Sequence, residues 1–415
     1  MRNVPISPSS HSSPELPSRS STGSPTPALL ALALGYFSLG TASLAVIGLS
    51  APIGADLHVR DATVGTLVTV FALVFAIAAP VAAVALGRMC RKRVLLLGLA
   101  LMIAGGIAGA VAPSFGVLTG ARVVAGLGAA IFGPAASAAG SLIVPPERRP
   151  RALATVFAGM TAATVLGVPV AASVGDAVGW RWAMAGVVAL TAAATALLAW
   201  LLPPVEAGPA PSARVFREVL RVPGALPMVA TTLLVLASQF TVYGVAGAYL
   251  AARFGASQGM VSVVLFVFGA VGMVGNSAGA RMFERLGGAR TIAVTLAGLA
   301  VTFAALTAVP DAPAAGIALF AFWAFFSASF VSPQQARLVE LLPAQRGILL
   351  ALNASALYLG MSLGSLLGSA LLPDLGACWL SALAFAPLAL AAAAHAASGR
   401  PSEPAVDAPL APAAK

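Results

Sequence analysis

The stretch ATVGTLVTVFALVFAIAAPVAAVAL, residues 62–86, is followed directly by the basic segment GRMCRKR, residues 87–93. The first segment carries no charged residue along its whole length. A helix needs about 20 predominantly apolar residues to cross the hydrocarbon core of a bilayer. The run is too long for a transmembrane β-strand and lacks the alternation of apolar and polar residues that such a strand shows. It therefore predicts a membrane-spanning helix that ends in a basic loop.

The same pattern recurs along the 415 residues, of which 59% are hydrophobic and 9% are charged. Soluble domains carry about 25% charged residues, so this composition excludes a soluble enzyme, a nucleic-acid binder and a secreted disulfide scaffold. We expect twelve membrane-spanning helices and thus an all-α polytopic membrane protein. The expected spans are residues 28–50, 62–86, 94–112, 115–143, 152–175, 182–202, 225–251, 259–280, 290–309, 313–336, 347–371 and 376–397.

The basic residues predict the orientation of the chain. With the N-terminus placed in the cytoplasm, 19 of the 23 Lys and Arg residues fall in cytoplasmic segments. Only Arg60, Arg181 and Arg253 fall in outer loops, and Arg122 lies within a helix. Basic residues concentrate in short cytoplasmic loops. Both termini are therefore expected in the cytoplasm of a bacterium, with the chain in its inner membrane, and the net charge of +10 reflects topology rather than a nucleic-acid partner.

A Pro-rich polar stretch at 203–223 divides the spans six and six. At an offset of 197 residues, Arg88 maps onto Arg285, and Pro146, Arg149 and Gly167 map onto Pro343, Arg346 and Gly364. Six helices per half keep the same orientation, as in transporters built from parallel repeats, although twelve helices without duplication remain the alternative. The expected segments are a disordered cytoplasmic tail at 1–27, six-helix bundles at 28–202 and 224–398, the linker at 203–223, and a cytoplasmic tail at 399–415.

Two loops at equivalent places in the halves carry a related motif. They read AVALGRMCRKR, residues 83–93, and ARMFERLGGAR, residues 280–290. Here the sequence resembles the major facilitator superfamily, which has a G-x-x-x-D-R-x-G-x-R/K-R/K loop after its second helix and often a weaker copy after its eighth. The resemblance implies the major facilitator fold and a latch that holds the halves closed at the cytoplasmic face. The gating-loop candidates are Arg88, Arg91, Lys92, Glu284, Arg285, Gly287 and Arg290.

The two loops differ in charge. Gly87 stands where the first copy of the motif has its acid, so only Glu284 retains a carboxylate, and Glu284 with Arg285 is the better latch candidate. The alternative is that both loops only anchor the topology through their positive charge.

Arg122 is the only charged residue that we place well inside a helix, and Gly126 follows four residues later. A charge at membrane depth normally faces a cavity or a partner. The superfamily has an Arg and a Gly at these places, and the resemblance implies a role in proton coupling or in the electrostatics of the substrate cavity. Alternatively the side chain extends from the outer end of the helix to the membrane interface.

The fifth span contains Gly159, Gly167, Pro169 and Gly175. Small residues allow helices to approach closely, and proline weakens the helical hydrogen bonding. Exporters of the superfamily carry G-x-x-x-G-P-x-x-G-G on this helix, and the partial match favours export over import. We therefore expect a hinge in this helix, while ordinary tight packing is the simpler interpretation of its glycines.

Longer strings narrow the resemblance. These are Gly40-Thr41-Ala42, Asp56-Leu57, VPPERR at 144–149, SPQQAR at 332–337 and NASALYLG at 353–360. Together they resemble the bacterial drug:proton antiporter branch with sugar-efflux permeases and chloramphenicol exporters. That branch commonly has Glu shortly after the Gly-Thr of its first helix, where this chain has Ser43. No carboxylate lies deep in the expected helices, so coupling must use an end residue such as Asp56 or Asp176, or transport is weakly coupled or facilitative.

The helices that line the cavity in the family supply the substrate-contact candidates. They are Tyr36, Thr41, Ser43, Ser238, Gln239, Tyr243, Ser327, Asn353 and Tyr358. Each could equally bond a neighbouring helix. A nearly uncharged cavity of this kind suits a neutral or hydrophobic solute better than an anion.

The sequence thus predicts a secondary transporter rather than an enzyme. It exports a small drug-like or sugar-like solute by alternating access, with proton as the coupling ion, and an importer or facilitator of a small metabolite is the alternative. The two cysteines, Cys90 and Cys378, form neither a disulfide framework nor a metal cluster, and we expect no cofactor and no metal. We expect a monomer whose partners are the small-molecule substrate, the proton and the lipid bilayer.

Overall fold

The computed structural model describes residues 25–206, 213–309 and 312–398. Within these residues the secondary structure is helical throughout, without β-strands. Eleven helical spans are long and apolar enough to cross a membrane, and the last of them, Arg346–Ser398, contains two crossings. They are separated at Gly376, whose φ of 77° is a left-handed conformation that glycine adopts without steric cost. The prediction of twelve transmembrane helices is confirmed.

The first half contains six crossings joined by short connections. Its long helices are α1 (Thr26–Gly48), α4 (Thr66–Ala85), α5 (Arg91–Ala110), α6 (Phe115–Leu142), α7 (Arg149–Ala162) continued by α8 (Val168–Val178), and α9 (Trp180–Leu201). The short helices α2 (Ser50–Leu57) and α3 (Asp61–Val64) connect α1 to α4. Between α7 and α8 the chain forms a π-helical turn, Ala163–Gly167.

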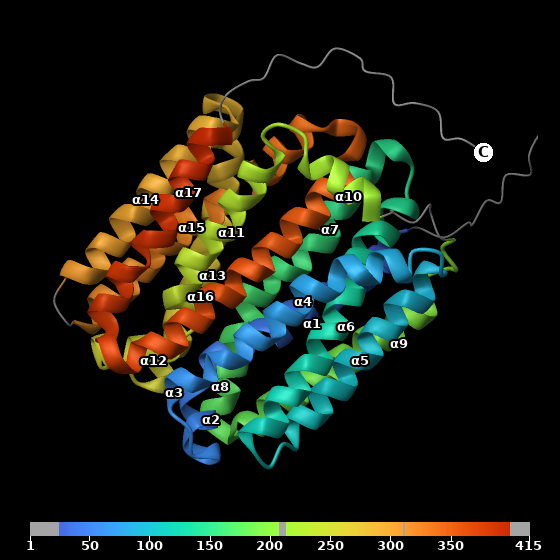
Figure 1. Cartoon of the computed structure of the whole chain (residues 1–415). Helices are drawn as coiled ribbons and strands as arrows, with labels where there is room; N and C mark the ends of the chain where they lie inside the picture. Colours follow the sequence, from blue (N-terminus) through green and yellow to red (C-terminus); the bar gives the residue numbers. More distant parts are fainter. Residues whose placement is uncertain (1–24, 207–212, 310–311, 399–415) are drawn as a thin grey trace, which may run out of the picture.

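The second half repeats this arrangement. Its helices are α11 (Ala225–Tyr243), α12 (Ala246–Phe254), α13 (Gln258–Leu286), α14 (Gly288–Ala308), α15 (Pro313–Leu341), α16 (Arg346–Leu383) and α17 (Phe385–Ser398). Gly167 and Gly364 occupy matched sites: a Cβ at Gly167 would overlap Thr41 of α1, and a Cβ at Gly364 would overlap the backbone of α11. The two halves lie side by side, with α10 (Ala213–Leu220) in the connection between them (Figure 1).

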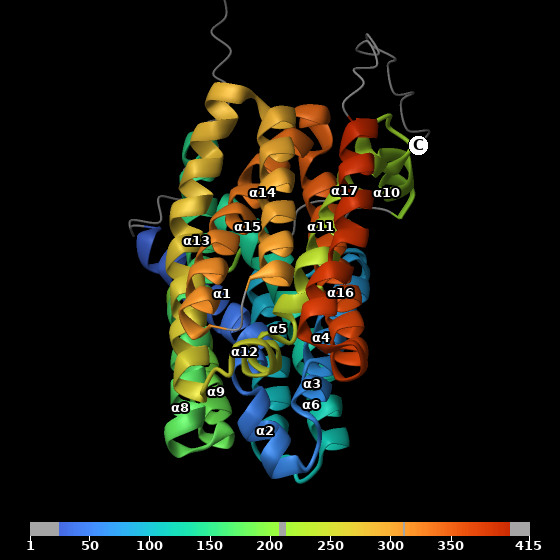
Figure 2. The same ribbon diagram turned by 90° about the vertical axis from the view of Figure 1, so that its left-hand side faces the viewer.

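The ends of the molecule differ. Helices α2, α3 and α12 lie at one end, and α10 lies at the other, as both views show (Figures 1 and 2). We call these the α2 end and the α10 end. The helix formed by α7, the π-helical turn and α8 runs from the α10 end to the α2 end (Figure 1).

The halves are joined at the α2 end. Ser365 Oγ of α16 donates a hydrogen bond of 2.8 Å to the carbonyl of Gly65, and the Gln258 side chain of α13 donates to the carbonyl of Gly48. Helix α8 and the π-helical turn pack extensively against α13, whereas α7, nearer the α10 end, does not. We call the contact surface between the two halves the seam. The seam is therefore closed at the α2 end.

Three expected segments differ from the structure in detail. The expected span 225–251 is interrupted at Gly244, which ends α11 before α12 begins. The linker 203–223, expected to be a polar stretch, contains α10. The expected tails fall mainly on residues 1–24 and 399–415, which lie outside the described residues, and α1 begins already at Thr26.

Candidate functional site

Arg122 on α6 is buried in the first half, with 3% of its surface exposed. Its Nη2 donates 2.8 Å to the carbonyl of Ser43, and its Nη1 donates 2.5 Å to the carbonyl of Ala42, both on α1. Its Nε donates 3.2 Å to the carbonyl of Leu67 on α4, and the guanidinium carbon lies 4.4 Å from the ring centre of Phe71. The alternative in which Arg122 extends to the membrane interface is therefore wrong, because its charge is already satisfied by backbone carbonyls and an aromatic face.

Gly126 explains how α4 comes within reach of Arg122. A Cβ at Gly126 would lie 3.0 Å from the carbonyl oxygen of Phe71, so a larger residue would push α4 away from α6. The Arg and Gly spacing thus places the guanidinium beside carbonyls of two helices. A cavity of about 30 Å³ adjoins Arg122 between α1, α5, α6 and α9.

Buried charge in the described residues is entirely basic. None of the carboxylates there is buried, and Asp61, at the start of α3, is the one that is half-buried rather than exposed. Arg253 and Arg337, expected in loops, are instead 5% exposed within α12 and α15, so their placement in loops is wrong, and the side of the membrane assigned to them stays a prediction. Both reach neutral acceptors: Arg253 donates to the Val309 carbonyl, and Arg337 donates to Ser398 Oγ at 2.8 Å.

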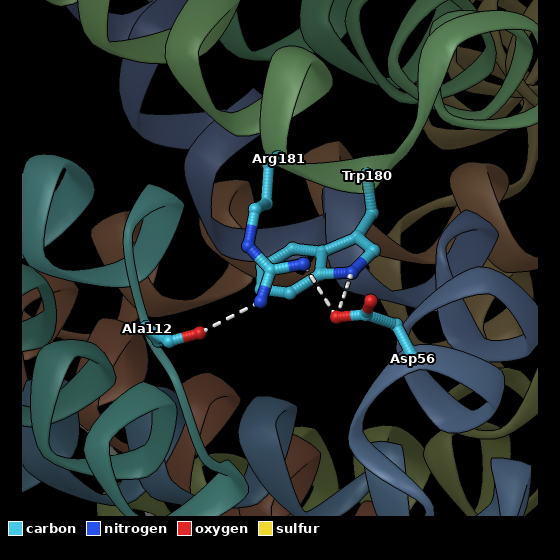
Figure 3. A network of polar contacts seen from close by, with 4 residues as sticks. All are labelled: Asp56, Ala112, Trp180 and Arg181. Atoms are coloured by element: carbon cyan, nitrogen blue, oxygen red, sulfur yellow. Dashed lines mark hydrogen bonds and ion pairs between the residues drawn. The ribbon is translucent and has the colours of Figure 1, made fainter.

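Asp56 belongs to a polar network at the α2 end (Figure 3). It forms an ion pair with Arg181 and accepts a hydrogen bond of 3.2 Å from Trp180 Nε1, while Arg181 Nη2 donates 2.9 Å to the carbonyl of Ala112. The hydrogen bond from Arg181 holds the pKa of Asp56 below its ordinary value. Asp56 is therefore held ionised at neutral pH, and Asp176 on α8 is exposed.

In the first half, the three cavity candidates are all buried. The Tyr36 hydroxyl donates 2.7 Å to the Gly133 carbonyl and contacts Ser137 Oγ at 2.8 Å, which ties α1 to α6. Thr41 Oγ1 donates to the carbonyl of Phe37 within its own helix. Ser43 offers its carbonyl to Arg122. Thr41 and Ser43 thus serve helix packing in this conformation.

In the second half, Gln239 and Tyr243 come together around a residue that was not among the candidates. Trp323 of α15 donates 3.2 Å from Nε1 to Gln239 Oε1, and its ring centre lies 5.9 Å from that of Tyr243. Phe268 of α13 completes this group, 4.6 Å from Tyr243. Ser238 faces the other way and donates 2.7 Å to the Ala384 carbonyl.

The remaining cavity candidates lie on α15 and α16. Ser327 is half-buried on α15. Asn353 accepts a hydrogen bond of 2.6 Å from Thr232 Oγ1, and Gln334 Nε2 donates 3.3 Å to the same hydroxyl. Tyr358 stacks on Phe75 of the first half, so it lies at the seam.

The gating-loop candidates lie outside the closed part of the seam. The side chains of Arg88, Glu284 and Arg285 are exposed, and Arg91 and Lys92 are half-buried. No ion pair of Glu284 occurs among the described residues, so the latch stays a prediction for a conformation in which this face closes. Gly287 adopts a φ of 78° and ends α13, and Arg290 is exposed on α14.

The fifth crossing combines tight packing with an irregular backbone. A Cβ at Gly159 would overlap the carbonyl of Ala33, and one at Gly175 would overlap Leu49, so both glycines pack against the first crossing. Gly167 ends the π-helical turn, and Pro169 lies in the first turn of α8. Turns of this kind occur often at functional sites, and the hinge remains a prediction.

Sequence reasoning missed Trp323, Phe268 and Phe75. Trp323 lies in the aromatic run FAFWAFF at 320–326, which was a visible signal. The sequence gives no signal for Phe75 and Phe268, because nothing distinguishes them from other apolar residues of a membrane helix until the facing helix is known.

Comparisons with known proteins agree with this architecture. A family model described as Major Facilitator Superfamily matches residues 30–247 and 228–415. The inner membrane transport protein YdhP of Escherichia coli (strain K12) is 28% identical over 349 residues, which cover 83% of this chain and 88% of that protein. A chloramphenicol resistance protein of Streptomyces lividans is 35% identical over 299 residues, 70% of this chain and 75% of that protein.

A solved structure has the same fold. It is a bacterial homologue of the human lysosomal transporter Spinster in an inward-facing and unoccupied conformation, with a TM-score of 0.70 and 15% identity over 91% of this chain and 98% of that one. The family match extends over both halves, and the helices of both halves pack in the matching fold. The chain is therefore a multi-pass membrane transporter and not an enzyme, and it belongs to the major facilitator superfamily.

Proposed function

We propose that this protein exports a small neutral or hydrophobic solute, drug-like or sugar-like, across the bacterial inner membrane by alternating access. The observation that carries the proposal is the one-sided seam. Two hydrogen bonds and the packing of α8 on α13 join the halves at the α2 end, while α7 does not pack extensively on α13 toward the α10 end. Rocking of one half against the other about such a seam exposes a central site to each side in turn.

The orientation follows from the loop charges. The basic loops favour a cytoplasmic position for the α10 end and both termini, and the open side of the seam would then face the cytoplasm. A solute would enter from that side and leave at the α2 end. The name of the chloramphenicol resistance protein and the glycines of the fifth crossing both favour this direction.

The substrate site that we propose is the group Gln239, Tyr243, Trp323 and Phe268 of the second half. Aromatic rings with one amide oxygen offer a large apolar contact area and little charge, which suits a neutral solute. No buried carboxylate in the described residues would attract a cationic drug. The protein acts as a monomer, since each chain contains both halves.

Coupling to protons is part of the proposal, and facilitated export is the second candidate. The specific observation that favours the second candidate is the absence of a buried carboxylate among residues 25–206, 213–309 and 312–398. Proton exchange at the outer-end carboxylates would require Asp56 to leave Arg181 when the α2 end opens. A proton binds a carboxylate more readily once a cationic partner has moved away.

Transport in inverted membrane vesicles tests the proposal. Labelled chloramphenicol and a labelled neutral sugar are offered with and without an imposed proton gradient. Uptake that depends on the protein supports export, and its acceleration by the gradient supports antiport. Gradient-independent uptake identifies a facilitator, and the absence of uptake for both solutes contradicts the substrate class.

The proposed site is tested in the same assay with Trp323→Phe and Tyr243→Leu. Both should raise the KM for the solute more than they lower the maximal rate, because they remove ground-state contacts. Trp182→Phe is the matched control, because Trp182 is 69% exposed on α9. Equal effects of Trp323→Phe and Trp182→Phe would refute the site.

A further inference from the structure

A pocket of about 540 Å³ lies at the α10 end of the first half, outside the proposed substrate site. Its walls are Cys90, Lys92, Arg93 and Leu96 on one side and Pro204 and Glu206 on the other. The first group forms the start of α5, and the second follows α9. Its volume falls within the range of roughly 300–1,000 Å³ that small ligands occupy.

The wall after α9 is anchored to the loop before α5. The peptide N–H of Arg91 donates a hydrogen bond of 2.9 Å to the carbonyl of Val205. The side chains of Leu202 and Val205 are 1% and 9% exposed, so the segment is held by apolar contacts as well. One backbone hydrogen bond and the buried side chains of Leu202 and Val205 thus hold the two walls together, at the point where the first half continues into the linker.

The charge of the pocket is predominantly positive. Lys92 is half-buried and Arg93 is exposed in its wall, and Arg88 and Arg91 lie in the same loop, which contains no acid. The Nε of Arg91 is buried and lacks a hydrogen-bond partner among the described residues. Glu206 is the one acidic residue in the wall. An anion with several acceptor oxygens, such as a phosphate group, matches these donors.

The surroundings of the pocket are those of a membrane interface. Trp200, near the end of α9, is 82% exposed, and Leu97, next to the pocket residue Leu96, is 41% exposed. Exposed Trp is typical of the level of the lipid headgroups, whereas exposed Leu on a membrane helix faces the acyl chains. A ligand in the pocket therefore has apolar surface beside it and cationic groups around it.

We infer that this pocket binds the phosphate headgroup of an anionic phospholipid of the cytoplasmic leaflet. Basic pockets at the cytoplasmic ends of membrane helices attract such headgroups. A bound lipid would connect the loop before α5 to the segment that leads into the linker, since both contribute pocket walls. Its acyl chains would lie along the exposed residues of α5 and α9.

Delipidated full-length protein in a neutral detergent provides the test. Phosphatidylglycerol or phosphatidylcholine is titrated in, and bound lipid is counted by native mass spectrometry. Phosphatidylglycerol should bind more tightly than phosphatidylcholine. Lys92→Gln combined with Arg93→Gln should weaken its binding by about 25-fold, since each basic side chain near an anionic surface contributes about a factor of five.

Two further variants make the test specific. Glu206→Gln should tighten binding of phosphatidylglycerol, because it removes the carboxylate that repels the phosphate. Arg217→Gln combined with Arg221→Gln is the matched control: both residues are exposed in or beside α10, and the double change also removes two positive charges. It should leave the tight binding unchanged.

Each outcome decides the inference. Equal losses in the pocket variant and the α10 control would mean that general surface charge attracts the lipid, and would overturn the site. The titration is repeated with inorganic phosphate at the concentration of the lipid, to distinguish a lipid headgroup from free phosphate as the ligand. Displacement of the lipid by free phosphate at equal concentration would overturn the assignment to a lipid, and failure to displace it would support that assignment.

Discussion

Phe75 of the first half stacks on Tyr358 of the second half, with ring centres 3.7 Å apart and ring planes inclined by 22°. Both side chains are buried, and they lie on α4 and α16. The hydrogen bond from Ser365 to the Gly65 carbonyl joins α16 to the residue directly before α4, nearer the α2 end. These two helices therefore form one side of the closed seam and must separate when the α2 end opens.

The closure at the α2 end requires the absence of a side chain at Gly65. A Cβ there would lie 2.5 Å from Ser369 Oγ and 2.6 Å from Val245 Cγ1, both in the second half. Gly65→Val should therefore hold the α2 end open and abolish export. The measurement is labelling of a cysteine at Ser50, which is 4% exposed in the closed seam, by an impermeant maleimide in a protein without Cys90 and Cys378.

Gly120→Val is the control for this experiment. No atom lies within 4 Å of a Cβ built at Gly120, so that variant should transport normally and protect the cysteine at position 50. Unchanged protection in Gly65→Val would show that the seam tolerates the side chain.

The contact between the π-helical turn and α13 gives a second prediction. A Cβ at Gly269 would lie 2.6 Å from Val165 Cα, whereas at Gly272 the nearest atom would be 3.7 Å away. Gly269→Ala should reduce the transport rate strongly, because backbone cannot move aside as a flexible side chain does, and Gly272→Ala should not. Equal rates in the two variants would argue against a tight pivot at this turn. The rates are compared in vesicles at equal amounts of inserted protein.

Arg122→Ala should abolish transport while leaving membrane insertion intact. It leaves carbonyls of Ala42, Ser43 and Leu67 without their donor, so the folded protein should lose about 2–4 kcal/mol of stability. Arg122→Lys should fail as well, because a single ammonium cannot reproduce the planar fork of three hydrogen bonds. Transport and thermal unfolding of Arg60→Gln, which changes an exposed arginine directly before α3, provide the reference. Transport at the normal rate by Arg122→Ala would assign this residue to folding alone.

The Asp56–Arg181 ion pair makes stability depend on pH in one direction. The pKa of Asp56 is lower in the folded protein than in the unfolded chain, so its contribution is present above the unfolded value of about 3.9 and is lost as the pH falls through the folded value. The unfolding temperature of the protein should exceed that of Asp56→Asn at neutral pH, and the difference should shrink below about pH 4.

The effect of this pair should be small. Both partners are about 40% exposed, and exposed ion pairs contribute at most about 1 kcal/mol. Asp176→Asn, which removes an exposed carboxylate that has no ion pair among the described residues, is the matched control for the loss of one negative charge. A difference for Asp56→Asn that persists unchanged to pH 3 would contradict the prediction.

The sequence by itself determined the fold class, the number of crossings and the division into two halves. Each follows from local properties: a run such as 62–86 is long enough to span the bilayer whatever packs against it. The family was also visible, because the loop at 280–290 and the Arg122–Gly126 spacing are local strings. The burial of Arg337 was missed, since one more helical turn moved it from a loop into α15.

The tertiary structure alone decided which polar residues bond neighbouring helices and which face the seam. Ser238 and Gln239 are adjacent in the sequence, yet one bonds the Ala384 carbonyl between α16 and α17 and the other bonds Trp323. The physical reason is the bilayer. In a bilayer the helix faces that contact lipid are as apolar as those that contact other helices, so the pattern of apolar residues does not show which face is buried. Which face of α11 contacts which neighbour becomes known only when the packing of the helices is known.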